Sequence, residues 1–343
     1  MRRCSRRYFA ALMTVGAVTL AACAGGTSDT VGGEAAGGDG SAGTINLYAY
    51  AVPKPGFDKI FPAFDATEEG EGVKVQPSYG ASGDQSRKVT DGAEADVVNF
   101  SVEPDITRLV DFGLVDKSWD QDAYNGVPFG SVVTLVVRED NPKNIRDWDD
   151  LLRPGVEVVA PNPFSSGSAK WDLLAPYAAK SNGGEDPDAG LAYITSLVND
   201  HMRIQPASGR AASEAFLQGT GDVLISYENE ALFLEEHGEP IEYVTPPTTF
   251  KIENPVAVLA NSKNLEKAVA FKDFLYTPEA QRLWAEAGFR PVDPAVKSEF
   301  AEKFPEPTKL WTIADFGGWS AVDSELFAED SGSIAMIYDN ATR

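Results

Sequence analysis

The sequence contains few of the side chains on which enzyme and metal chemistry most often depends. It has only two cysteines, Cys4 and Cys23, and only two histidines, His201 and His237, among 343 residues. Because both cysteines precede residue 24, the rest of the chain holds no disulfide, thiol nucleophile or cysteine metal ligand. Neither histidine has a second histidine at ligand spacing, which argues against a zinc site.

The glycine signatures of several enzyme classes are also missing. No Gly-x-Ser-x-Gly elbow is present, since Ser166-Gly-Ser168 lacks the flanking glycines and no histidine lies in an evident partner context. The chain has no phosphate-binding loop and no dinucleotide-binding glycine pattern. We therefore expect a protein that is not an enzyme and that uses no cofactor or metal.

Basic charge is scarce as well. Lysine and arginine together number 29 against 52 acidic residues, which gives a formal net charge of −23. Nucleic acid is not an expected partner, because binding it requires a basic face. A small anion is not excluded, because N–H donors at close range in a dry cleft outweigh distant, screened surface charges.

The apolar stretch near the N-terminus, Tyr8 to Leu20, is too short to span a bilayer stably. It follows a region with four arginines and precedes Leu20-Ala-Ala-Cys23, which looks like a bacterial lipobox. These features predict a lipoprotein signal peptide over residues 1–23, with lipidation at Cys23. Ser5-Arg-Arg-Tyr-Phe9 also resembles a twin-arginine signal, so general secretory and twin-arginine export both remain open.

The next segment, residues 24–43, consists almost entirely of small and polar residues. Such a composition cannot bury enough apolar surface to fold, so we expect a flexible tether. The folded part is then expected to begin near Thr44 and to be exported and held by its lipid at the outer face of the cell membrane.

Strand-like runs alternate with helical patterns from that point onward. The expected strands are Ile45–Tyr50, Val73–Gln76, Asp96–Phe100, Ser131–Arg138, Val156–Ala160, Asp222–Tyr227, Ile241–Val244 and Pro255–Ala260. Helical patterns fall between most of them and include Asp105–Phe112, Ala189–Val198, Leu265–Tyr276 and Pro278–Ala287. This alternation predicts an α/β fold with mostly parallel sheets. A further helix is expected to start near Ser166, and Pro176 should kink or end it.

A Ser-Gly pair stands at three places where a helical pattern follows a strand pattern. These pairs begin at Ser82, Ser166 and Ser208, and Ser165 or Ser166 is the natural N-cap of the middle helix. A helix start with unpaired N–H groups and no bulky side chains favours an anion. Ligand sites in open α/β sheets lie beyond the carboxyl ends of the strands, so the three starts are expected to face one cleft. The alternative is three ordinary capped helices.

One more group of residues ends a strand. The run Asp222–Ser226 delivers Tyr227 at its carboxyl end, followed at once by Glu228-Asn-Glu230. Tyr227 can offer its hydroxyl to a ligand, or it can be an aromatic residue at a sheet end with a preferred acidic first helical turn after it. The residues alone leave both interpretations open.

Several blocks together resemble the sulfate-binding proteins of bacterial ABC importers. They are Asn162-Pro-Phe-Ser-Ser-Gly-Ser-Ala-Lys-Trp171, Tyr79-Gly-Ala-Ser-Gly-Asp-Gln85, Ala95-Asp-Val-Val-Asn99, Gly221-Asp-Val-Leu-Ile-Ser-Tyr-Glu-Asn-Glu-Ala231, Arg290-Pro291 and Phe316-Gly-Gly-Trp319. The blocks occur in the family's order and span nearly all of the chain after the leader. The resemblance implies a type II periplasmic binding protein, an α/β fold of two lobes with the ligand cleft between them. Lobe one is expected over residues 44–130 plus 246–343, and lobe two over 131–245.

The resemblance also implies how the anion is held, because the family binds dehydrated sulfate with main-chain N–H groups, one serine hydroxyl and one indole N–H. The implied ligand residues here are Ser82, Ser166, Gly167, Ser168, Gly209 and Tyr227. At the third start the register is open by one, with Ser208 as the alternative, and Arg210 is expected to support the site from outside. Tyr227 departs from the family's indole donor, and Ser168 stands where the family usually has glycine.

The expected function is capture of sulfate, with thiosulfate as an alternative, and its delivery to the permease subunits of an ABC importer by a monomeric protein. Molybdate, tungstate and phosphate are the rival anions. A secreted hydrolase using Ser166 or Ser168 and a structural surface lipoprotein are the rivals from other classes.

Overall fold

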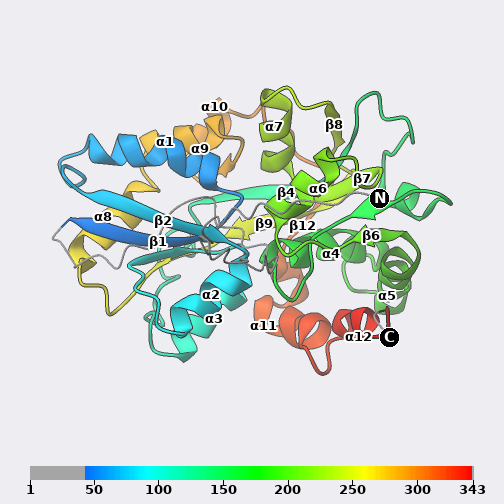
Figure 1. The fold of residues 1–343 in the computed structure, drawn as a ribbon, viewed down its shortest axis with the longest axis horizontal. Helices are drawn as coiled ribbons and strands as arrows, with labels where there is room; N and C mark the ends of the chain where they lie inside the picture. The colour runs from blue at the N-terminus through cyan, green and yellow to red at the C-terminus, as the bar shows by residue number, and fades with distance from the viewer. Residues whose placement is uncertain (1–42, 342–343) are drawn as a thin grey trace, which may run out of the picture.

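The computed structural model describes residues 43–341, which fold around two β-sheets (Figure 1). The strands are β1 (Thr44–Tyr50), β2 (Lys74–Gly80), β3 (Val97–Asn99), β4 (Phe129–Arg138), β5 (Val158–Val159), β6 (Met202–Ile204), β7 (Val223–Tyr227), β8 (Ile241–Val244), β9 (Thr248–Asn254), β10 (Val256–Val258), β11 (Arg290–Pro291) and β12 (Lys309–Trp311). The α-helices are α1 (Lys54–Asp65), α2 (Ser82–Thr90), α3 (Glu103–Asp111), α4 (Gly167–Lys180), α5 (Pro187–Ser196), α6 (Gly209–Leu217), α7 (Glu228–Glu236), α8 (Leu265–Phe274), α9 (Pro278–Glu286), α10 (Pro294–Glu299), α11 (Trp319–Val322) and α12 (Ser333–Ala341). Single turns of other helix types are η1 (Trp148–Leu152), η2 (Leu197–His201), η3 (Ile313–Phe316) and η4 (Asp323–Phe327).

The predicted signal peptide, its Cys23 and the tether up to residue 42 lie outside the described residues. Within residues 43–341, no helix has the length and apolar character needed to cross a membrane.

The smaller sheet has the strand order β10-β3-β1-β2, and helices cover both of its faces. Phe57 and Phe64 of α1 pack with Trp284 of α9 on one face, whereas Ile106 and Leu109 of α3 pack on the other, next to α2. Figure 1 shows these two helix pairs above and below the sheet. The parallel strands β1, β2 and β3 therefore end at one edge, where α1, α2 and α3 begin.

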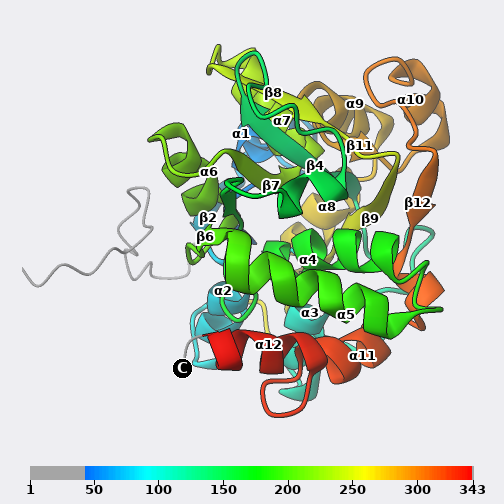
Figure 2. The ribbon, with the colours of Figure 1, turned by 90° about the vertical axis from the view of Figure 1, so that its right-hand side faces the viewer.

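The larger sheet has the order β12-β9-β4-β7-β5-β6, and β8 and β11 also pair with β4. Successive side chains of the central strand β4 point to opposite faces of the sheet, and so enter two different hydrophobic cores. Leu135 faces the core that contains Trp171 of α4, and Val136 faces the core that contains Phe216 of α6. Figure 2 shows α4 and α5 side by side on the first of these faces.

The predicted α/β class is confirmed, but the prediction of mostly parallel sheets is wrong in part. β4 pairs antiparallel with β7, β8, β9 and β11, and β10 pairs antiparallel with β3. Antiparallel neighbours need only a short connection rather than a helical crossover. The pattern analysis did not identify β9, which follows β8 after a short turn, and so overlooked this arrangement.

The C-terminal segment lies against the larger sheet. β12 pairs with β9, and Trp319 of α11 packs edge-on against Trp171 of α4 with ring centroids 4.6 Å apart. Lys170 of α4 forms an ion pair with Asp323. The two predicted lobe boundaries fall inside β4 and between β8 and β9.

Helix α4 continues past Pro176 to Lys180, so the expected end of the helix at this proline does not occur. Proline lacks the N–H that would bond the carbonyl of Asp172, four residues earlier. Pro176 is buried, and packing of almost the whole of α4 in the core maintains the helix despite that missing bond.

Candidate functional site

Three helices start where the sequence places its Ser-Gly pairs. α2 begins at Ser82, α4 at Gly167 and α6 at Gly209, each preceded by a residue with extended backbone angles. The first N–H groups of a helix have no acceptor within the helix, so each start offers main-chain donors. Ser208 caps α6 by accepting a hydrogen bond from the N–H of Ala211 at 3.2 Å.

Ser166 occupies the N-cap position of α4, but it does not make the expected capping bond. Its hydroxyl pairs with the hydroxyl of Ser168 at 2.7 Å instead. Both serines are almost fully buried, and this contact holds two hydroxyl groups together at the start of the helix. The predicted N-cap position of Ser166 is confirmed, but the predicted hydrogen bond from its hydroxyl to a first-turn N–H group is not present.

Small residues allow the three starts to approach closely. A Cβ atom added to Gly167 would lie 2.9 Å from Ser101 Cβ, and one added to Gly209 would lie 2.9 Å from Ser168 Oγ. A Cβ atom on Gly83 would lie 3.1 Å from the carbonyl oxygen of Ser165. The start of α4 therefore contacts the starts of both α2 and α6, and lies against the turn between β3 and α3.

Ser101, in that turn, is the contact that the sequence analysis missed. Its N–H donates to Ser82 Oγ at 2.9 Å, and its hydroxyl pairs with the Tyr227 hydroxyl at 2.7 Å. Its carbonyl accepts from Trp171 Nε1 at 2.8 Å and from Asn254 Nδ2 at 3.0 Å. A signal was present, because Ser101 also lies between a strand pattern and a helix pattern, but it lacks the glycine that marked the other three starts.

Tyr227 lies at the end of β7 and at the N-cap position of α7, where its side chain is 2% exposed. Burial raises the pKa of its phenol well above the ordinary value, so the hydroxyl keeps its proton at neutral pH. Arg290 fixes the next residue by a bidentate ion pair with Glu228, with N–O distances of 2.6 and 2.9 Å. Tyr227 is thus rigidly placed beside Ser101.

The structure brings all six of the predicted ligand residues together. They are Ser82, Ser166, Gly167, Ser168, Gly209 and Tyr227, from α2, α4, α6 and β7. A fourth segment joins them, because Val52 in the turn between β1 and α1 would lie 3.4 Å from a Cβ atom on Gly209. Main-chain donors and hydroxyl groups of both sheets therefore surround one small buried region.

Two carboxyl groups near this region are already engaged by other side chains. Asp105 accepts from Ser82 Oγ at 2.6 Å and pairs with Arg108 at 3.0 Å. Glu230 pairs with Arg210 at 3.0 Å, so the arginine next to Gly209 is directed at a buried carboxylate.

Two aspartates differ in environment. Burial raises the pKa of Asp172 in α4 well above its ordinary value, which favours the uncharged acid there. Asp84 in α2 is half exposed and pairs with Arg87 outside the site.

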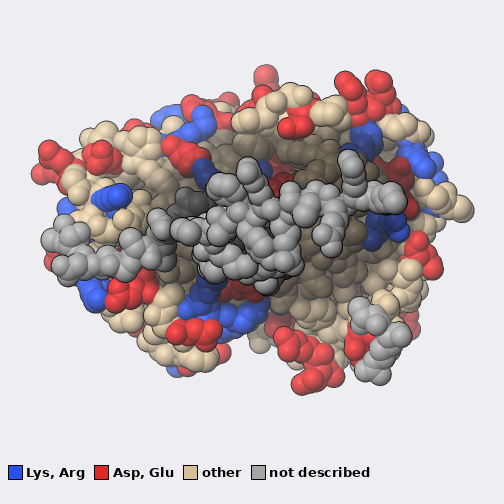
Figure 3. All heavy atoms as spheres, in the orientation of Figure 1, with Lys and Arg blue, Asp and Glu red and all other residues tan. Residues whose placement is uncertain are grey.

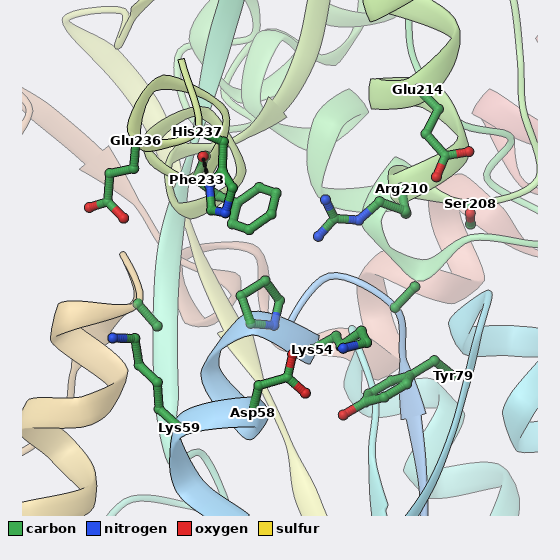
Figure 4. Close-up of a pocket in the computed structure, with 13 residues that line it drawn as sticks. Lys54, Asp58, Lys59, Tyr79, Ser208, Arg210, Glu214, Phe233, Glu236 and His237 are labelled. Carbon is green, nitrogen blue, oxygen red and sulfur yellow. Dashed lines mark hydrogen bonds and ion pairs between the residues drawn. The ribbon is translucent and has the colours of Figure 1, made fainter. Parts of the chain in front are cut away.

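A cavity of about 600 Å³ lies beside the buried region, between α1 on one side and α6 and α7 on the other (Figure 4). Ser208 and Arg210 line it at the start of α6, and Lys54 at the start of α1 and Tyr79 of β2 line the opposite side. On the face in Figure 3, acidic side chains lie mainly around the periphery, with lysine and arginine among them.

Neither histidine is near the predicted ligand residues in the hydrogen-bond network, although His237 lines the cavity. His201 Nδ1 lies 3.0 Å from the carbonyl oxygen of Val156, and His237 Nδ1 lies 2.8 Å from that of Phe233. Among residues 43–341, no cluster of histidine and carboxylate side chains is arranged to hold a metal ion.

Three helix starts beside two β-sheets lie around one buried region rich in hydrogen-bond donors, an arrangement typical of proteins that bind a small solute. The chain belongs to the family of bacterial extracellular solute-binding proteins, whose family model matches residues 45–290.

Its similarity to individual proteins is more specific. A sulfate-binding protein of Synechococcus elongatus is 38% identical over 337 residues, covering 95% of each chain. A thiosulfate-binding protein of Pseudomonas aeruginosa is 35% identical over 300 residues, covering 84% of this chain and 88% of its own. The solved structure of the sulfate-binding protein SubI from Mycobacterium tuberculosis is 65% identical with a TM-score of 0.82, covering 83% of this chain and 99% of that one. These relatives confirm the resemblance to sulfate-binding proteins seen in the sequence.

Proposed function

We propose that this protein captures sulfate outside the cytoplasm and delivers it to the permease subunits of an ABC importer, without catalysing a reaction. The observation that carries the proposal is that the starts of α2 and α4 and the Tyr227 phenol all contact Ser101, while the start of α6 lies against the start of α4. Relatives named as sulfate-binding proteins over most of the chain support the same ligand.

The donor set suits an anion that carries no proton. Sulfate is fully ionised at neutral pH, so every hydrogen bond that it makes must come from a donor. Main-chain N–H groups at Ser82, Gly167 and Gly209 supply donors together with the positive ends of three helix dipoles. The Ser166 hydroxyl and the Tyr227 phenol add two side-chain donors, and none of these groups brings a counter-charge that would have to be desolvated.

The proposed organisation follows from the same arrangement. Residues 44–130 with 246–343 form one lobe and residues 131–245 the other, with the C-terminal helices packed on the second. The cavity between α1 and α6 is the proposed access route, and closure of the lobes is the state that the permease recognises. We further propose that the protein is monomeric and is anchored through lipid on Cys23 after export.

Thiosulfate is the second candidate ligand, because one relative over most of the chain is named as a thiosulfate-binding protein. A hydrolase built on Ser166 is disfavoured by the geometry, since its hydroxyl bonds to Ser168 and the two histidines contact main-chain carbonyls elsewhere.

Isothermal titration calorimetry of the purified protein tests the proposal. Sulfate, thiosulfate, phosphate and molybdate are titrated separately at pH 7 and fixed ionic strength. We expect sulfate to bind at one site per chain and more tightly than phosphate or molybdate. Absence of binding by both sulfate and thiosulfate, or preferential binding of phosphate, would refute it.

A further inference from the structure

Ser101 is fully buried, and its three polar groups each contact a different part of the site. Its N–H donates to Ser82 at the start of α2, beside the same smaller sheet, and its hydroxyl pairs with Tyr227 of β7 in the larger sheet. Its carbonyl accepts from Trp171 of α4 and Asn254 of β9.

We propose that Ser101 is a positioning residue for the anion: its hydroxyl donates to the phenol oxygen of Tyr227 and thereby directs the Tyr227 O–H group at the ligand. The inference deepens the proposed function and rests on it. Ser101 lies in the turn after β3 of the smaller sheet, and Tyr227 ends β7 of the larger sheet, so the bond joins the two halves.

The direction of the bond follows from counting donors and acceptors. Each hydroxyl has one proton, and either oxygen can accept from the other at 2.7 Å. Among the described residues, the phenol oxygen is the acceptor within hydrogen-bond distance of Ser101 Oγ. If Ser101 donates, both protons are used once an anion accepts from Tyr227. If Tyr227 donated instead, the buried Ser101 proton would need another acceptor.

The chemistry of a phenol explains why such a partner is needed. An indole holds its single N–H in the ring plane, so the ring position fixes the donor direction. A phenol proton rotates about the C–O bond, and the oxygen can also accept. Burial raises the pKa of Tyr227 well above its ordinary value and keeps the group a donor, but burial alone does not orient the proton. The Ser101 hydroxyl does so, and the bond forms only when the two halves are together.

A double-mutant cycle on sulfate affinity tests this. Tyr227→Phe removes the ligand donor and should weaken sulfate binding by roughly ten- to a hundredfold. Ser101→Ala removes only the orienting bond and should weaken it by roughly three- to tenfold, through faster dissociation. In the Phe background, Ser101→Ala should have almost no further effect. The matched control is Ser298→Ala, an exposed serine on α10 whose substitution should change nothing.

A second pair of variants gives a readout that packing alone would not produce. In Tyr227→Trp the indole needs no orienting partner and is larger than the phenol, so it should press on the Ser101 hydroxyl. Ser101→Ala should therefore improve binding in the Trp background while it weakens binding in the wild-type background. Melting temperatures of all variants without ligand establish that each is folded.

The outcomes separate the two proposals. A wild-type protein that binds neither sulfate nor thiosulfate refutes the proposed function. Wild-type binding with an unchanged Ser101→Ala variant, or with equal losses from Ser101→Ala in the wild-type and Phe backgrounds, overturns the inference alone. A larger loss from Ser101→Ala than from Tyr227→Phe would make Ser101 itself the ligand donor, which also overturns it.

Discussion

Replacing Gly167 by alanine should push the start of α4 away from the turn that follows β3, and so keep the two proposed lobes apart at the site. Gly167 is the first residue of α4, and its Cα faces the turn that carries Ser101 and Val102. A Cβ atom there would lie 2.9 Å from Ser101 Cβ and 2.9 Å from Val102 Cγ2. Alanine suits the first turn of a helix, so the substitution does not strain the backbone of α4 itself.

The contact distances set the size of the effect. Non-bonded carbon atoms rest about 3.5–4.0 Å apart, so each contact would be short by roughly 0.6–1.1 Å. A shift of that size would stretch the 2.7 Å bond between Ser101 and Tyr227 to the limit of a hydrogen bond or past it. Overpacking of this kind costs about 1–3 kcal/mol, which corresponds to roughly five- to 150-fold in affinity.

The assay is sulfate titration by calorimetry, with thermal unfolding of the ligand-free protein alongside. The steric overlap at residue 167 arises only when the two proposed lobes are closed. The melting temperature of the ligand-free protein should therefore change little, while the increase in melting temperature caused by sulfate should become smaller. Gly209→Ala is the matched comparison, because its Cβ atom would make one contact under 3.0 Å, with the Ser168 hydroxyl, whereas Gly167→Ala would make two. Gly209→Ala should therefore lose less sulfate affinity than Gly167→Ala. Sulfate affinity within about twofold of wild type in Gly167→Ala would show that this contact does not control closure.

Three further predictions concern the ligand donors and the buried acid. Ser166→Ala deletes one hydroxyl donor and should weaken sulfate binding by roughly ten- to a hundredfold in calorimetry; an unchanged affinity would place Ser166 outside the site. Sulfate should be preferred over phosphate by at least about a hundredfold at pH 7 in competition titrations. Phosphate keeps a proton that needs an acceptor, and the nearby carboxylate of Asp105 already accepts from Ser82. Equal affinity for the two anions would require a hydrogen-bond acceptor at the ligand. Burial raises the pKa of Asp172 in the folded protein, so its carboxyl group stays protonated there. Its contribution to the free energy of unfolding therefore falls as the pH rises above the pKa of an aspartate in the unfolded chain. Asp172→Asn should therefore raise the melting temperature at pH 7 more than at pH 3, and an equal shift at both would point to packing instead.

Much of the fold was accessible from the sequence because it depends on local patterns. The run Ile45–Tyr50 and the run Ile241–Val244 correspond to β1 and β8, and the three Ser-Gly pairs do mark helix starts. What local patterns could not supply was the pairing partner of each strand. β4 is buried on both faces, so its sequence shows no alternation that would reveal four antiparallel neighbours.

The same limit applies to the site. The glycine patterns pointed to Gly167 and Gly209, because neighbouring side chains lie too close to these positions for an added Cβ atom. Ser101 carries no such mark: its partners Ser82, Trp171 and Tyr227 are up to 126 positions away, and only the folded chain brings them together. Main-chain donors at the helix starts are oriented by the helix itself, whereas an oriented phenol depends on one particular neighbouring hydroxyl. Ser101, which the sequence patterns did not single out, is thus the residue on which the direction of the Tyr227 hydroxyl depends. Its substitution is the most informative experiment on this site.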